Sequence, residues 1–284
     1  MSGTQQVAVV TDSTCDIPAE LAAAEGVTVV KLLVMFPDGE TFHDGELTQA
    51  EFFERMGRAK ALPTTSQPPV GDFAAVYEKL LETFPHVVSV HVSNRLSGTI
   101  ESARQAAESF ARRVHVFDTL NLSTAAGWQA IEAARVAALG AGPEEVMQAA
   151  ERLRSRVRHI IGLDKLDYLA RGGRIGAVSA FMGGLLDLKV LLTVDPDGAF
   201  KPVTRERGHT AAMRETLEYV KREMGGQTRG RFMVAHSMSP DTAAYLRDAI
   251  AGAYEATELM IVETGVTIST HTGTGWGIGF VPGD

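Results

Sequence analysis

Short apolar runs rich in β-branched residues alternate, along residues 6–157, with segments whose apolar side chains recur every three or four positions. The first pattern predicts buried strands, and the second predicts helices with one apolar face. Their alternation is typical of βαβ units and a largely parallel, doubly wound sheet. The expected strands are residues 6–10, 27–35, 86–92 and 114–117, and the expected helices are residues 18–25, 48–58, 70–83, 97–110, 125–139 and 144–157.

The pattern changes in the second half of the chain. Residues 189–194 and 200–203 flank the turn sequence Asp-Pro-Asp-Gly, which predicts an antiparallel hairpin and therefore a mixed sheet. We place a domain boundary near residue 155, between an N-terminal α/β domain (1–155) and a C-terminal α/β domain (156–284). The other elements expected in the C-terminal domain are strands 159–163, 231–235 and 259–264 and helices 210–224 and 240–251.

Composition narrows the possible functions. The 284 residues are 45% hydrophobic and 22% charged, which is ordinary for a globular protein. The net charge of -8 argues against nonspecific binding to nucleic acid or anionic membranes, although it leaves transient membrane contact open. The single cysteine, Cys15, makes no intrachain disulfide and fits a reducing compartment. Without a signal peptide or the roughly 20 apolar residues of a transmembrane helix, we expect a cytoplasmic protein.

Hydroxyl-bearing residues gather near the ends of the predicted strands. Because parallel sheets bind ligands at the carboxyl ends of their strands, these residues are candidates for one shared pocket. The same residue types also form turns and helix caps, and Ser97 or Thr99 would cap the helix expected at 97–110. The four clusters are Thr11-Asp12-Ser13-Thr14, residues 93–99, residues 118–124 and the loop Pro63-Thr64-Thr65-Ser66-Gln67-Pro68-Pro69.

The usual catalytic and cofactor motifs are absent from the sequence. It contains no G-x-S-x-G elbow, no phosphate loop of the form G-x-x-x-x-G-K-[ST] and no H-E-x-x-H. One cysteine cannot supply a cysteine-rich zinc site. The glycine-rich segment after His271 fails the dinucleotide-binding spacing, although its glycines would let the imidazole approach a ligand closely. We therefore expect neither a metal nor a cofactor.

Two further segments have an unusual composition. In Arg171-Gly172-Gly173-Arg174, two arginines flank a pair of glycines. This segment is either a surface turn or a place where guanidinium groups await a carboxylate or a phosphate. Residues 181–186 are apolar and suit either the core or the wall of a hydrocarbon tunnel.

Together these segments resemble the DegV family of bacterial fatty-acid-binding proteins, which includes the FakB subunits of fatty acid kinase. Each motif is weak alone, but the set occurs in the family's order and spans nearly the whole chain. The matching segments are TDSTCDIP (11–18), PTTSQPP (63–69), LSGTIESAR (96–104), RGGRIG (171–176), LLDLKVLLTVDPDG (185–198) and HTGTGWG (271–277).

The resemblance implies a two-domain α/β fold with one long-chain fatty acid held between the domains. It also implies a binding subunit without catalysis of its own. A separate ATP-dependent fatty acid kinase would convert the presented carboxyl group to an acyl phosphate for phospholipid synthesis. By motif, the carboxyl-binding residues are Thr65, Ser66, Ser97 and His271. The residues facing the phosphorylated head group or the kinase are Arg174 and either Arg205 or Arg207.

Three departures from the family's pattern bear on the acyl-chain preference. Asn94-Arg95 stands where a small Ser-Gly pair is common, which predicts a bulkier and more cationic pocket mouth. Residues 123–128 replace a usually smaller segment. Trp276 enlarges the end of the glycine-rich stretch.

Two other functions fit the same residues. A hydrolase or acyltransferase would use Ser97 with His271, which requires the Ser97 hydroxyl within hydrogen-bond reach of an oriented imidazole. A lipid sensor would bind the same acid and have no kinase partner.

Overall fold

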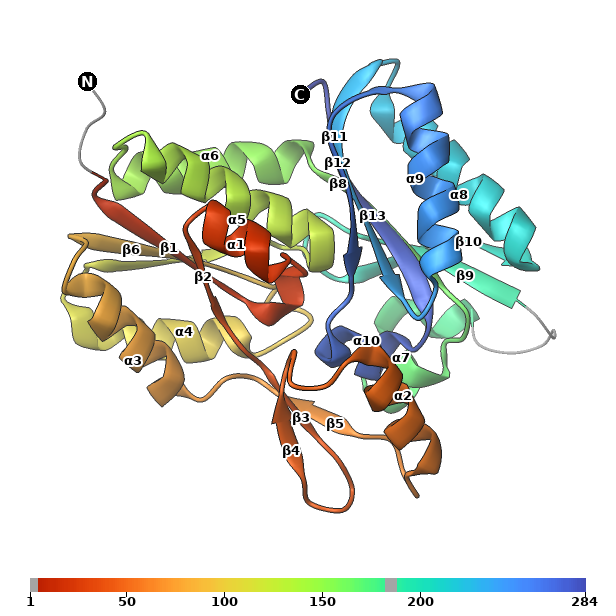
Figure 1. The fold of residues 1–284 in the computed structure, drawn as a ribbon, viewed down its shortest axis with the longest axis horizontal. Coiled ribbons are helices and arrows are strands. Elements are labelled where there is room, and N and C mark those ends of the chain that lie inside the picture. Colours follow the sequence, from red (N-terminus) through yellow and green to blue (C-terminus); the bar gives the residue numbers. More distant parts are fainter. Residues whose placement is uncertain (1–4, 182–187) are drawn as a thin grey trace.

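The computed structural model describes residues 5–181 and 188–284 and has two halves, each built on its own β-sheet (Figure 1). Most of the apolar segment 181–186, interpreted above as core or tunnel wall, lies outside the described residues. The first half confirms the predicted parallel sheet, whose strand order is β2-β1-β6-β7. These strands are β1 (Val7–Asp12), β2 (Val27–Val30), β6 (His86–His91) and β7 (Val114–Asp118).

Helices cover both faces of this parallel sheet, as Figure 1 shows. Side chains of successive strand residues point to opposite faces, so Val7 and Val9 pack with α5 and α6 while Ala8 and Val10 pack with α3 and α4. Both faces are therefore buried, which explains the continuous apolar runs in the sequence. The helices are α1 (Ala19–Ala24), α3 (Val70–Leu81), α4 (Thr99–Ala107), α5 (Ser123–Ala138) and α6 (Pro143–Arg156).

The second half contains the expected mixed sheet, in the order β10-β9-β8-β13-β11-β12. Among the described residues of this sheet, only β11 and β12 pair in parallel, and β9 and β10 form the predicted hairpin. Helices α8 (His209–Met224) and α9 (Pro240–Ala253) pack against one face. The strands are β8 (Arg158–Leu163), β9 (Leu188–Val194), β10 (Phe200–Arg207), β11 (Arg229–Ser237), β12 (Glu255–Glu263) and β13 (Gly275–Pro282).

Helix α5 lies between the two sheets and joins the halves. On one side it packs in the core of the parallel sheet, and on the other Trp128 packs with Met233 and Val281 of the mixed sheet. The Trp128 indole donates a hydrogen bond of 3.0 Å to the Gly279 carbonyl. Trp128 therefore fills the core between the halves rather than a ligand cavity. In the described residues the parallel sheet ends at residue 118 and the mixed sheet begins at residue 158; the boundary near residue 155 stays a prediction.

One predicted strand, residues 27–35, proves to be two strands in different sheets. Its first part is β2, while β3 (Leu33–Met35) pairs with β4 (Thr41–His43) and β5 (Thr64–Ser66) in a small antiparallel sheet. The apolar pattern continues through the break because buried side chains lie on both sides of it, so nothing local marks the change of partner. Helix α2 (Gln49–Arg58) packs on this small sheet.

The sequence pattern did not predict the last helix and the last strand. The short α10 (Val266–Thr272) is buried at six of its seven positions and so lacks the polar face that marks an amphipathic helix. Strand β13 is glycine-rich and lies between β8 and β11. The remaining elements are α7 (Asp167–Arg171) and the 3₁₀ turns Ser13–Cys15, Glu108–Phe110 and Gly176–Phe181. Among the described residues, no helix has the length and apolar character needed to cross a bilayer.

Candidate functional site

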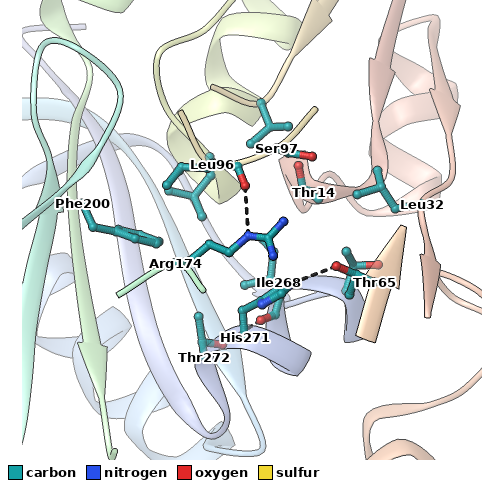
Figure 2. A pocket seen from close by; sticks show the side chains of 13 residues that line it. Thr14, Leu32, Thr65, Leu96, Ser97, Arg174, Phe200, Ile268, His271 and Thr272 are labelled. Atoms are coloured by element: carbon teal, nitrogen blue, oxygen red, sulfur yellow. Dashed lines mark hydrogen bonds between the residues drawn. The ribbon is translucent and has the colours of Figure 1, made fainter. Parts of the chain in front are cut away.

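A cavity lies between the two halves of the molecule (Figure 2). Part of its wall is polar, and the rest is hydrocarbon from both halves. The apolar lining residues are Leu32, Val92, Leu96, Leu122, Phe200 and Ile268. The polar lining residues are Thr14, Thr65, Ser97, Arg174, Thr267, His271 and Thr272.

Two predicted site residues, Thr65 and His271, meet across the interface at this cavity. Thr65 belongs to β5 of the first half and His271 to the last turn of α10 in the second. Thr65 Oγ1 and His271 Nε2 lie 2.8 Å apart, although the residues are 206 positions apart in sequence (Figure 2). The TSQP motif and the late histidine therefore form one site.

The imidazole of His271 is mostly buried, and the double glycine makes room for it. A Cβ atom on Gly172 would lie 2.2 Å from His271 Nδ1, so only glycine fits beside the ring. Burial, followed by the charge of Arg174, lowers the pKa of His271 to about 4. His271 is therefore neutral at pH 7 and available as a hydrogen-bonding group without a net charge.

Ser97 reaches the cavity from the turn that precedes α4. Its hydroxyl lies 2.9 Å from that of Thr99 and accepts a hydrogen bond of 3.3 Å from the Thr99 backbone N–H. The N-cap position belongs to Gly98, where a Cβ atom would lie 2.0 Å from Oε1 of Gln67. Gln67 in turn donates to Ser102 of α4, at 2.8 Å. The motifs around Thr65 and Ser97 thus dock against each other through Gln67.

A buried polar chain behind the cavity was not predicted. Thr14 lines the cavity and donates its hydroxyl proton to Asp12, at 2.5 Å. The other Asp12 oxygen contacts His91 Nδ1 at 2.9 Å, and His91 Nε2 contacts Ser89, which accepts from Tyr77. Burial raises the pKa of Asp12, but hydrogen bonds from His91 and Thr14 outweigh it and lower the pKa overall. Asp12 and His91 are the last residues of two neighbouring strands, and this position is the one feature of the sequence from which their contact could have been predicted.

Asp16 from the first half holds the start of α10, the helix that carries His271. Its carboxylate accepts hydrogen bonds from the Gly265 backbone N–H at 2.9 Å and from the Ser123 hydroxyl at 2.5 Å. Burial raises the pKa of Asp16 to about 7. The TDSTCDIP motif therefore contributes twice, through Thr14 in the cavity wall and through Asp16 at the helix.

Arg174 connects the cavity with a wider vestibule outside it. Its guanidinium donates to the carbonyls of Gly172 at 2.6 Å and Leu96 at 3.3 Å, so it crosses from one half to the other (Figure 2). The vestibule is also lined by Ser97, Asn94 and Arg95. The departure Asn94-Arg95 thus lies at the mouth of the cavity, and Arg174 of RGGRIG lines both the cavity and the vestibule.

The other predicted site residues do not line the cavity or the vestibule. Ser66 follows Thr65 on β5, so its side chain points to the opposite face, where it donates to the Gln67 carbonyl at 3.0 Å. Arg205 and Arg207 are exposed near the far end of β10 from Phe200. A role for Arg205 or Arg207 toward a partner stays a prediction.

Fold and site together define a two-domain α/β protein with a hydroxyl-lined cavity between its domains. The family model described as "Uncharacterised protein, DegV family" matches residues 6–283. The DegV domain-containing protein of Deinococcus radiodurans is 36% identical over 272 residues, which cover 95% of either chain. The chain therefore belongs to the DegV family.

Solved structures of the family share this fold. A DegV family protein from Thermus thermophilus, whose structure is described as showing fatty acid binding, is 38% identical with a TM-score of 0.92, covering 98% of this chain and 99% of that chain. DegV from Bacillus subtilis, described as a fatty acid binding protein, is 31% identical with a TM-score of 0.87, covering 98% and 99%. Family members with closely similar structures thus bind fatty acids.

Proposed function

We propose that this protein binds one long-chain fatty acid between its domains and presents the carboxyl group to a separate ATP-dependent kinase for acyl phosphate formation. The observation that carries the proposal is the Thr65–His271 hydrogen bond beside the apolar wall of the interdomain cavity. An amphipathic ligand with one polar end matches such a cavity. The fatty-acid-binding relatives from Thermus and Bacillus support it.

The carboxylate is held by hydroxyl donors rather than by a buried cation. With the proton of neutral His271 on Nε2, the ring donates to Thr65 Oγ1 and leaves the Thr65 proton free for a ligand oxygen. Nδ1 has no hydrogen-bond acceptor among the described residues, which favours this tautomer. Ser97 supplies a second O–H from the other side of the cavity. Two charge-assisted hydrogen bonds of this kind contribute roughly 1.5–3 kcal/mol each.

The hydrocarbon wall supplies most of the affinity. Burying about 14 methylenes at ~0.8 kcal/mol each yields on the order of 11 kcal/mol before the costs of association are subtracted. The lining side chains Leu32, Leu96, Leu122 and Phe200 come from both halves, so the acyl chain would lie along the interface. The hydroxyls then orient the acid more than they retain it.

The vestibule suits the step that follows binding. Arg95 and Arg174 line it next to Ser97, where the carboxyl group would be presented. An acyl phosphate carries more negative charge than a carboxylate, and guanidinium groups bind phosphate oxygens in pairs. We assign these arginines to the phosphorylated head group or to the docking kinase.

Binding without catalysis fits the contacts better than a Ser/His hydrolase. The hydroxyl of Ser97 pairs with Thr99, whereas His271 Nε2 pairs with Thr65. His271 Nδ1 has no hydrogen-bond partner among the described residues, so no carboxylate orients the ring as a general base. A nucleophile–base–acid arrangement is therefore not assembled around Ser97.

Two measurements test the binding step. Mass spectrometry of the denatured protein should detect a copurified C14 to C18 acid, the range implied by the family resemblance. Fluorescence displacement should show affinity falling about tenfold or more in Thr65→Val and in Ser97→Ala, because each loses a bond to a charged group. Thr64→Val is the matched control, since Thr64 is the exposed neighbour on β5. Protein that carries no acid and takes none up refutes the proposal.

A paired experiment tests the presenting step. Arg174→Ala should bind the fatty acid within about threefold of wild type while forming much less acyl phosphate with a fatty acid kinase. Arg171→Ala, the exposed arginine of the same motif, is the matched control. Loss of fatty-acid binding in Arg174→Ala would mean that Arg174 itself binds the carboxyl group. Full phosphorylation by Arg174→Ala and the Arg95→Ala/Arg174→Ala double variant would remove the arginines from the mechanism.

A further inference from the structure

The fatty-acid cavity has a neighbour deeper in the molecule. Leu122, Ile268 and Thr272 line both the cavity and a second chamber, so the two share a wall. A long acyl chain that passes these three residues enters this inner chamber. Part of its wall is hydrocarbon, but the imidazole of His159 also faces it.

His159 lies on β8 and is only 2% exposed. Its Nδ1 lies 3.2 Å from Oδ1 of Asn121, and the same oxygen accepts a hydrogen bond from the Leu122 backbone N–H at 3.1 Å. An oxygen that accepts from Leu122 also accepts from the ring, so the His159 proton is on Nδ1. The Nε2 atom therefore carries a lone pair.

The Nε2 atom of His159 is aimed into the inner chamber and has no hydrogen-bond partner among the described residues. A Cβ atom built on Gly277, which lines the chamber, would lie 3.6 Å from it, so glycine keeps the space before the nitrogen open. Burial lowers the pKa of His159 to about 3, and the ring stays neutral. A buried acceptor without a donor is unfavourable, and buried polar groups in proteins are normally paired.

Two neighbouring hydroxyls in the chamber already use their protons within the protein. Ser123 donates to Asp16 at 2.5 Å, and Thr272 donates to the Ile268 carbonyl at 3.1 Å. Each hydroxyl therefore offers the chamber lone pairs, as His159 does. A ligand group that satisfies these acceptors is a hydrogen-bond donor. It must also be uncharged, because the chamber offers no carboxylate with a free oxygen to pair with a cation.

We infer that the inner chamber selects fatty acids with a hydroxyl group in the half of the acyl chain remote from the carboxyl group, with the O–H donated to His159 Nε2. The inference rests on the proposed fatty-acid binding and names the ligand class within it. An alcohol is small, neutral and a donor, and it adds only one oxygen to a chain that otherwise fits the apolar wall. A saturated tail leaves the His159 acceptor unpaired, whereas a hydroxylated tail pairs it.

Competition binding with a panel of C18 acids tests the inference. The probes are stearic acid and its 2-, 10-, 12- and 18-hydroxy derivatives, each displacing the same fluorescent fatty acid. At least one of the three distal derivatives should bind wild type as tightly as stearic acid or more tightly. The same derivative should lose roughly tenfold relative to stearic acid in His159→Phe, which keeps an aromatic ring but has no acceptor. The 2-hydroxy acid, whose hydroxyl stays near the carboxyl group, should be insensitive to His159→Phe.

Variants and outcomes separate this inference from the proposed function. His159→Gln can accept an O–H through its amide oxygen and should keep part of the preference, and His115→Phe on β7 is the matched His→Phe control. If stearic acid binds but every distal hydroxy acid binds wild type more weakly than stearic acid does, the inference is wrong and the proposed function stands. The inference also fails if His159→Phe leaves the distal preference unchanged. If no acid in the panel binds wild type, the proposed function itself is wrong.

Discussion

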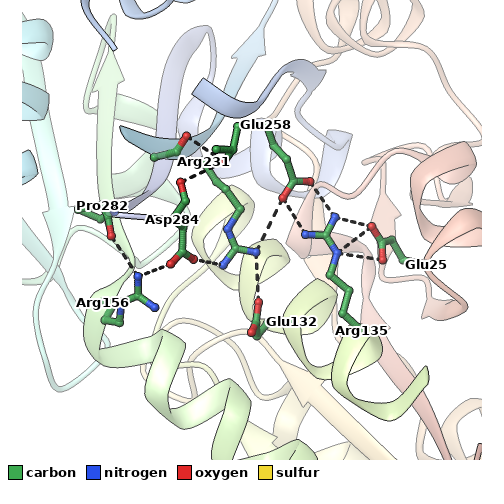
Figure 3. Close-up of polar contacts among 10 residues, drawn as sticks. Glu25, Glu132, Arg135, Arg156, Arg231, Glu258, Pro282 and Asp284 are labelled. Atoms are coloured by element: carbon green, nitrogen blue, oxygen red, sulfur yellow. Dashed lines mark hydrogen bonds and ion pairs between the residues drawn. The ribbon is translucent and has the colours of Figure 1, made fainter. Parts of the chain in front are cut away.

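At the cavity, the two halves of the molecule meet through hydroxyls, a neutral imidazole and an arginine that donates to backbone carbonyls, whereas around Asp284 they meet through arginines paired with carboxylates (Figures 2 and 3). In this second contact Arg231 of β11 has a side chain only 8% exposed, and it pairs with Asp284 and with Glu132 of α5, the latter at 3.1 Å. The Arg231 guanidinium also lies over the Trp128 ring. Because α5 belongs to the first half, this pair ties the halves together.

Arg135 of α5 extends the charged contact. It bridges Glu25 after α1, at 2.5 Å, and Glu258 on β12, at 2.7 Å (Figure 3). Arg231 is buried and its partners are partly buried, and such paired charges are costly to separate. Hydroxyls and a neutral imidazole can exchange a protein partner for a ligand oxygen without leaving a charge unpaired. We therefore expect the contact around Asp284 to hold the halves together and the hydroxyls and imidazole at the cavity to exchange partners with a ligand.

The largest expected effect comes from breaking the charged contact. Arg231→Leu removes the buried partner of Glu132 and Asp284, and Asp284 keeps only Arg156, so the free energy of unfolding should fall by about 1–3 kcal/mol, measured by urea denaturation. Fatty-acid affinity of the folded variant should change less than about twofold, since Arg231 does not line the cavity. Arg229→Leu on the same strand is the control: its side chain is 58% exposed and should cost below ~0.5 kcal/mol. A loss below ~1 kcal/mol in Arg231→Leu would refute this division of roles.

The two contacts should also respond to acid in different pH ranges. In the folded protein the pKa of His271 is about 4, below its usual 6.5. Between these values the unfolded chain binds a proton that the folded protein does not, so the free energy of unfolding decreases as the pH falls from 6.5 to 4. The pKa of Glu258 is lowered, mainly by the Arg135 hydrogen bond, so its contribution is lost only below about 4.5. Each group changes stability by at most ~1.4 kcal/mol per pH unit.

Urea unfolding across pH, compared between wild type and variants, checks these ranges. His271→Gln should flatten the curve between pH 6.5 and 4, and Glu258→Gln should flatten it only below about pH 4.5. Parallel curves for wild type and His271→Gln above pH 4.5 would show that the imidazole is not protected from protons in the folded state.

The contact between Thr65 and His271 should break when the space beside His271 is filled. Gly172→Ala places a Cβ atom 2.2 Å from His271 Nδ1, so the ring must shift away from Thr65. Because Gly172 has a helical φ of −75°, alanine suits the backbone and the steric effect is isolated. Fatty-acid affinity should fall about tenfold by fluorescence displacement. Gly71→Ala, where a Cβ atom meets nothing within 4 Å, is the control and should bind as wild type.

The smallest expected effect concerns Ser66. Its hydroxyl donates to the Gln67 carbonyl and does not line the cavity, so Ser66→Ala should change fatty-acid affinity by less than about twofold. The motif resemblance instead implies a loss similar to that of Thr65→Val. A tenfold loss in Ser66→Ala would mean that β5 turns its other face to the ligand.

The sequence alone determined the elements of the parallel sheet and the chemistry of the site. Period-2 and period-3.6 patterns are local, so β1, β6, β7 and their helices could be predicted within a few residues. The motifs likewise named Thr65, Ser97 and His271, which all line the cavity. Near strand ends, residue type was enough to indicate hydroxyl chemistry.

Only the tertiary structure decided which of these residues meet, and which way they face. Gly275 of β13 pairs with Leu163, and Asp12 pairs with His91, across separations that no local pattern encodes. Ser66 faces away from the cavity because β5 takes its register from β3. Hydrophobic patterning specifies that a residue is buried, whereas the partner it is buried against is set by the packing of segments far apart in the chain.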